Sequence, residues 1–76
     1  MGTPDYEQVR SAVLDAVRDE GLAPEVLQRR VTDRVGIVPG LPRLLEGLRR
    51  AGLLDEVLDA EGIRLTRGPK AGLYRE

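Results

Sequence analysis

The chain has 76 residues and a mass of 8.4 kDa, which is the size of one small domain. It contains neither Cys nor His, which excludes disulfides, thiolate metal sites, thiol nucleophiles and the most common general base. The formal net charge of −1 and the sequence pI near 5.5 differ from the strongly basic balance that is typical of simple polyanion binding.

The aliphatic content is sufficient for a small core that is built without Phe or Trp. No apolar run approaches the roughly 18 residues of a membrane-spanning helix, and no signal-peptide pattern opens the chain. We therefore expect residues 1–76 to form a single soluble domain in the cytoplasm, without a membrane partner.

Acidic and basic residues alternate in blocks along the chain. The formal charge is −4 over residues 1–28, +4 over 29–50, −4 over 51–62 and +3 over 63–76. Nearly all of the bases are Arg, whose planar guanidinium suits bidentate recognition of phosphate or carboxylate groups. A fold that gathers these blocks is expected to present one basic face and one acidic face.

A first helix is predicted to begin with Thr3 as N-cap and Pro4 in the first turn, and to close at Gly21. Five residues follow helical spacing and predict its buried stripe: Tyr6, Val9, Val13, Ala16 and Val17. Leu14 lies about 100° away from that stripe, so we interpret Leu14 and Val26 as candidate contacts of a homodimer.

A second helix is predicted from Pro24 to the residue before Gly36, with an inner stripe of Leu27, Val31 and Val35. A third helix is predicted from about Leu41 to Ala51, with Gly40 or Pro39 at its start. Its stripe of Leu41, Leu44, Leu45 and Leu48 faces the core, which leaves Arg43, Gly47 and Arg50 on the opposite side.

The last third of the chain predicts a β-hairpin. Residues 53–58 fit either a strand or a further turn of helix. Residues 63–66 alternate and are partly β-branched, residues 67–72 are rich in turn formers, and residues 73–75 fit a returning strand. This reading places Arg67 and Lys70 at the tip of the hairpin.

Three short helices, the third ending in the run Leu-Arg-Arg-Ala-Gly-Leu-Leu of residues 48–54, and then a basic-tipped hairpin resemble a winged helix-turn-helix domain. The resemblance implies a small α+β fold whose third helix enters the major groove of DNA, while the hairpin, or wing, touches the flanking backbone or the minor groove. It places Glu46 on the groove face and implies these DNA contacts: Arg29, Arg30, Arg34, Arg43, Gly47, Arg50, Arg67 and Lys70.

Two functions remain open at this stage. One is sequence-specific or architectural binding of duplex DNA, in transcriptional regulation. The other is a protein-docking or adaptor module, in which the Arg residues meet the carboxylates of an acidic partner; a helix followed by a basic hairpin also resembles the small docking domains of multimodular synthases.

An enzyme is not expected from this sequence. Ser11 and the threonines have no His to activate them. The carboxylates of Asp55, Glu56, Asp59 and Glu61 do not have EF-hand spacing, and the glycines match no nucleotide-binding fingerprint. We therefore predict no catalytic residue, cofactor or metal.

Overall fold

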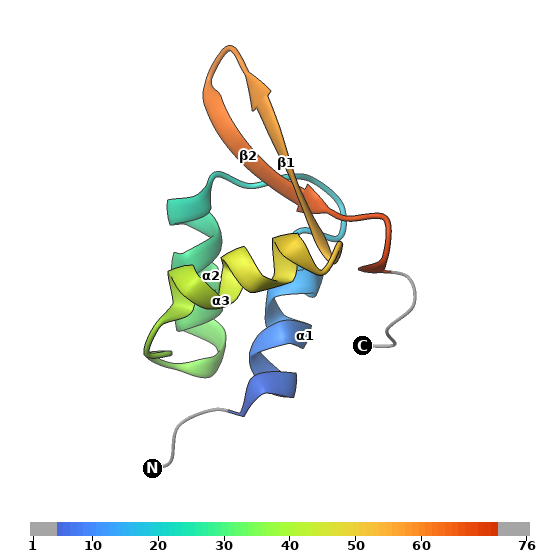
Figure 1. The fold of residues 1–76 in the computed structure, drawn as a ribbon. Coiled ribbons are helices and arrows are strands. Elements are labelled where there is room, and N and C mark those ends of the chain that lie inside the picture. The colour runs from blue at the N-terminus through green and yellow to red at the C-terminus, as the bar shows by residue number, and fades with distance from the viewer. Residues whose placement is uncertain (1–4, 72–76) are drawn as a thin grey trace.

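Three helices precede one β-hairpin in residues 5–71, the part of the chain that the computed structural model describes (Figure 1). The α+β class predicted from the sequence is confirmed. In chain order the elements are α1 (Tyr6–Ala16), α2 (Pro24–Val35), α3 (Leu41–Arg50), β1 (Leu54–Asp59) and β2 (Gly62–Arg67).

Helix α1 begins at a capping box. The side chain of Asp5 accepts a hydrogen bond from the backbone N–H of Gln8 at 2.8 Å, and the Gln8 side chain accepts one from the N–H of Asp5 at 3.3 Å. Asp5 is thus the N-cap in place of the predicted Thr3, and both Thr3 and Pro4 lie outside the described residues.

Helix α1 ends at Ala16, several residues before the predicted end at Gly21. The chain leaves the helix early because Leu22 pairs with β2: the N–H of Leu22 donates to the carbonyl of Leu65 at 2.9 Å, and the reverse bond is 2.7 Å. Gly21 serves this approach, because a Cβ at this position would lie 2.6 Å from the Thr66 side chain.

The predicted bounds of α2 and α3 are confirmed to within one residue. Helix α2 starts at Pro24, whose missing N–H costs nothing in the first turn, and ends where Gly36 takes a φ of 92°. Helix α3 starts after Gly40, which has a φ of 71° in the left-handed region, and ends at Arg50.

The hairpin is formed by β1 and β2, which pair antiparallel from Leu54 opposite Arg67 to Asp59 opposite Gly62. The ambiguous segment 53–58 is therefore mostly strand. The hairpin that the structure describes joins β1 to β2, whereas the sequence predicted one between residues 63–66 and 73–75; residues 73–75 lie outside the described part.

The turn of this hairpin falls at residues 60–61, where the Asp59 side chain accepts a hydrogen bond from the N–H of Glu61 at 2.8 Å. Gly62 follows with a φ of 119°, which favours glycine. The predicted basic tip is consequently wrong. Arg67 and Lys70 lie at or beyond the base of the hairpin, and the tip is acidic.

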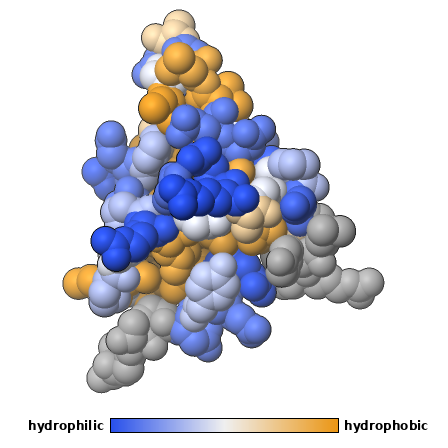
Figure 2. Space-filling model, in the orientation of Figure 1, coloured by the Kyte–Doolittle hydropathy of each residue, from blue (hydrophilic) through white to orange (hydrophobic). Residues whose placement is uncertain are grey.

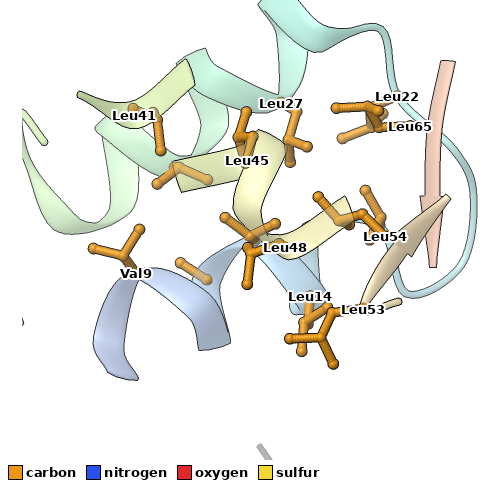
Figure 3. Packing of buried hydrophobic residues seen from close by; sticks show 14 of the residues in the cluster. Val9, Leu14, Leu22, Leu27, Leu41, Leu45, Leu48, Leu53, Leu54 and Leu65 are labelled. Atoms are coloured by element: carbon orange, nitrogen blue, oxygen red, sulfur yellow. The ribbon is translucent and has the colours of Figure 1, made fainter. Parts of the chain in front are cut away.

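One apolar core joins all of these elements (Figure 3). Most residues of the predicted stripes are buried: Val9, Val13, Val17, Leu27, Val31, Leu41, Leu45 and Leu48. Ala16, Val35 and Leu44, which belong to the same stripes, are only partly buried. Tyr6 was predicted to lie on the inner stripe of α1, but its side chain is exposed. The guanidinium carbon of Arg10 lies over the Tyr6 ring, 5.6 Å from the ring centroid.

Leu14 belongs to this core. Its side chain is fully buried, in the same cluster as Leu53, which lies just beyond the end of α3 (Figure 3). The interpretation of Leu14 as a dimer contact is therefore wrong, because the side chain has no exposed surface to offer a second copy. Val26, the other candidate, is exposed.

The arrangement agrees with winged-helix topology at the level of element order. The sheet has two strands, and an isolated bridge between Leu22 and Leu65 lies along β2 as well. Within residues 5–71, no helix has both the length and the apolar character needed to cross a bilayer.

Candidate nucleic-acid interface

The outer face of α3 lies opposite its buried leucines. Leu41, Leu45 and Leu48 point into the core, while Arg43 and Arg50 lie about 150–170° away around the helix and are exposed. Gly47 lies near them, and a Cβ built on it would meet nothing within 4 Å. The sequence thus correctly predicted which α3 side chains face outward. Figure 2 shows strongly hydrophilic colour across the front of the molecule at the level of this helix.

Glu46 is the one acidic residue on this outer face. Its carboxylate accepts two hydrogen bonds from Arg49, one of them from Nε at 3.1 Å, and lies 3.4 Å from Nε of Arg50. The hydrogen bond from Arg49, helped by the positive charges of Arg49 and Arg50, lowers the pKa of the Glu46 carboxyl, and the same contact raises the pKa of the Arg49 guanidinium. Glu46 is therefore ionised at neutral pH and orients two arginines.

A groove of about 190 Å³ separates α3 from the start of α2 and from the hairpin. Gln28 of α2, Arg49 of α3 and Glu56 of β1 line it, above an apolar floor that includes Leu45 and Leu65. Gln28 and Arg49 were not among the predicted contacts. The sequence did contain a signal for Arg49: it lies three residues after Glu46 on one helix, a spacing that favours an ion pair.

The three arginines of α2 do not share one surface. Arg29 is exposed on the side away from the core and makes no ion pair within residues 5–71. Arg30 and Arg34 lie on the flank toward α1, where Nη1 of Arg34 is 2.7 Å from Oδ2 of Asp15. Gln28 and Arg30 lie about 160° apart around the helix, so this flank faces away from the α3 groove.

Arg30 and Arg34 line a shallow hollow of about 480 Å³ between α1 and α2. Four carboxylates line the same hollow: Asp15, Asp19, Glu20 and Asp33. The predicted site is thus divided, since these two arginines belong to an acidic hollow that contains no residue of α3.

Lys70 lies close to the C-terminal end of α3. Its N–H donates to the carbonyl of Gly52 at 2.9 Å, and its side chain covers Gly52, where a Cβ would meet Cδ of Lys70 at 2.9 Å. Arg67 is half-buried at the base of the hairpin, opposite Leu54. Lys70 therefore extends the basic surface of α3, although it does not lie on a wing tip.

The free end of the hairpin is acidic. Asp59 and Glu61 flank the turn, and both pair with Arg64, at 3.3 and 3.4 Å from its Nη2. Among the described residues, no group of three or more acidic side chains has a geometry that could hold a metal ion. No known protein family, curated protein or solved structure matches this chain.

Proposed function

We propose that this domain binds duplex DNA through the outer face of α3. The observation that carries the proposal is the exposed pair Arg43 and Arg50 on either side of the bare position Gly47, on a helix whose opposite face is fully packed. Seven residues of helix separate the two arginines by about 10 Å, close to the length of three base-pair steps. Either guanidinium can reach O6 and N7 of a guanine in the major groove, because the groove admits a helix.

Contacts to phosphates come from residues outside this face. Arg29 on α2 and Lys70 beyond α3 make no ion pair with another described residue, so neither has to exchange an internal partner for a phosphate. The side-chain amide of Gln28, at the α2 side of the groove, is a further donor. Arg30 and Arg34 are left out of the interface, because they already face the carboxylates near α1.

The acidic hairpin end orients the domain on DNA. Phosphates repel the carboxylates of Asp59 and Glu61, so the complex forms with the free end of the hairpin directed away from the duplex. This differs from the wing contact that the sequence resemblance implied. The membership of the winged helix-turn-helix family and the role in transcriptional regulation are part of the same proposal. The element order and the isolated bridge between Leu22 and Leu65 are consistent with that family.

A second candidate is a docking module for an acidic protein. One observation favours it: Arg49 and Arg50 already bind a carboxylate of their own chain, that of Glu46. A partner's Asp or Glu could occupy the same face with similar geometry. The two candidates differ in their salt dependence, because only a duplex releases a condensed layer of counterions.

The test is a titration of a mixed-sequence duplex, followed by fluorescence anisotropy at several salt concentrations from about 50 mM upward. We expect the parent chain to bind, with a log–log salt slope near −0.9 for each neutralised phosphate. The double variant Arg43→Ala/Arg50→Ala should lose at least about tenfold in affinity and relax base preference, consistent with the loss of base contacts.

The matched control is Arg30→Ala/Arg34→Ala, which removes the same charge from the α1 flank and should change affinity only slightly. Circular dichroism of each variant checks that it is folded. If the parent chain does not bind at the lowest salt, or if both double variants lose affinity equally, the α3 interface is wrong. A partner protein that binds the same face without that salt slope would favour the docking candidate.

A further inference from the structure

The free end of the hairpin exposes aliphatic side chains that continue the core-facing side of the sheet. Leu58 and Ile63 lie directly opposite each other in the register, so both side chains project from the same face. Two residues inward on that face is Leu65, which is buried against Leu22. Leu58 and Ile63 are instead 77% and 46% exposed. The hairpin extends beyond the helices (Figure 1), and hydrophobic colour gathers toward its free end in Figure 2.

A hollow of about 250 Å³ adjoins Ile63 of this pair, between β2 and the segment that leads into α2. Its apolar lining includes Ile63, Leu22 and Val26, and Val26 is 39% exposed. Aliphatic surface of this kind at a protruding position is available to cover the side chains of another molecule.

Carboxylates surround the same hollow. Glu20, Asp59 and Glu61 line it, and Arg64 is the only basic lining residue in the described part of the chain. Arg64 is shared between Asp59 and Glu61, which leaves an excess of negative charge at the rim. The surface therefore combines an aliphatic floor with an acidic margin.

We propose that this surface, defined by Val26, Leu58, Ile63 and the carboxylates of Glu20, Asp59 and Glu61, docks a segment of a partner protein that combines aliphatic side chains with Lys or Arg. Aliphatic groups of the partner cover the exposed side chains, and its cations face the acidic margin. The proposal does not rest on DNA binding, which uses a different surface.

Charge also excludes the other occupants of this surface. Nucleic acid and anionic lipid carry the same sign as its margin and are repelled. Two copies that meet hairpin to hairpin would bring Asp55, Glu56, Asp59 and Glu61 of one chain close to their counterparts in the other. These like charges would repel each other and weaken self-association, so a basic partner fits the surface better than a second copy.

The experiment is a methyl-resolved NMR titration of the full chain with two short synthetic peptides. One alternates Leu with Lys, and the other has Glu in place of each Lys. We expect the basic peptide to shift the methyl resonances of Val26, Leu58 and Ile63 saturably, with the acidic peptide at least about tenfold weaker because the margin is negative.

Variants locate the contact. Leu58→Ser/Ile63→Ser removes the aliphatic pair and Glu61→Lys reverses a rim charge; each should weaken binding of the basic peptide by about fivefold or more. Ile37→Ser is the matched control, since Ile37 is 81% exposed in the connection between α2 and α3 and should not affect binding.

Three results would overturn the proposal: no saturable shift with the basic peptide, equal binding of both peptides, or loss of binding in Ile37→Ser as well. Methyl shifts that depend on protein concentration without any peptide would identify a second copy as the occupant and also refute it. Absence of DNA binding in the anisotropy assay leaves this proposal standing, and failure here leaves the α3 interface standing.

Discussion

Gly68 is the position where an added methyl group should damage the fold most directly. It is buried where the base of the hairpin passes the turn after α3. A Cβ at this position would lie 2.3 Å from the carbonyl oxygen of Gly52 and 2.8 Å from backbone atoms of both Leu53 and Leu54. Backbone atoms cannot rotate away, so the two segments would have to separate.

Separation also strains the hydrogen bonds that hold the segments together. The N–H of Gly68 donates to the carbonyl of Leu53 at 2.8 Å, and the N–H of Lys70 donates to the carbonyl of Gly52 at 2.9 Å. Overpacking costs about 1–3 kcal/mol and each lost hydrogen bond about 1 kcal/mol. We therefore expect Gly68→Ala to lower the free energy of unfolding by about 3 kcal/mol, most of the stability that a core of this size provides.

Gly47→Ala is the matched control. It adds the same methyl group inside α3, where nothing lies within 4 Å, and should raise the free energy of unfolding by up to about 1 kcal/mol through helix propensity. Urea denaturation followed by far-UV circular dichroism measures both. If Gly68→Ala unfolds at the same urea concentration as the parent chain, the packing of residues 68–71 against the turn is wrong.

Three further substitutions test other parts of the structure. Leu48→Ala should cost about 2–5 kcal/mol, because Leu48 is fully buried; melting within a few degrees of the parent would contradict the orientation of α3. Asp5→Ala removes the N-cap of α1 and should cost about 1 kcal/mol in urea denaturation, with Gln8→Ala weakening the same cap. The pKa of the Glu46 carboxyl, followed by NMR, should lie below its usual range and should rise in Arg49→Gln. Because folding lowers this pKa, the contact stabilises the fold fully above the usual pKa of a Glu carboxyl, and this stabilisation is lost as the pH falls through the lowered pKa of Glu46.

The helices were predictable because their signals are local. Pro24 and Gly36 bound α2, Gly40 precedes α3, and each needs only the backbone preferences of its own residue. The start of α1 was predicted less well, since Thr3, Pro4 and Asp5 all have side chains or ring geometry suited to a helix start.

The hairpin was harder to predict because its signals are ambiguous without the partner strand. Leu54, Val57 and Leu58 have the spacing of a helix face, whereas Leu54 and Leu58 also lie on one face of a strand. Pairing with β2 selects the strand. The burial of Leu14 was missed for the same reason, because it depends on how all the elements, including Leu53 after α3, pack into one core.

The candidate interface likewise has features that the sequence predicts and features that depend on tertiary packing. Helical periodicity alone predicted that Arg43 and Arg50 face outward from α3. It could not predict that Arg34 pairs with Asp15, 19 residues away in the sequence, because this contact depends on how α1 packs on α2. Which arginines remain available to a phosphate is therefore a property of the tertiary structure.

Glu46 offers the most direct test of how the α3 face receives a ligand. Arg49 binds the Glu46 carboxylate with two hydrogen bonds, whereas Arg50 approaches it through one 3.4 Å contact and is 78% exposed. Arg50 can thus turn to a phosphate or a guanine while Arg49 keeps Glu46 in place.

Replacing the carboxylate in Glu46→Gln removes the only negative charge of this outer face, so we expect DNA affinity to rise several-fold at low salt and the gain to shrink as salt increases. The isosteric control Asp19→Asn makes the same change of charge in the hollow between α1 and α2, which contains no residue of α3, and should produce a smaller gain. Equal gains in the two variants would show that only net charge matters, and an unchanged affinity in Glu46→Gln would contradict docking of DNA on α3.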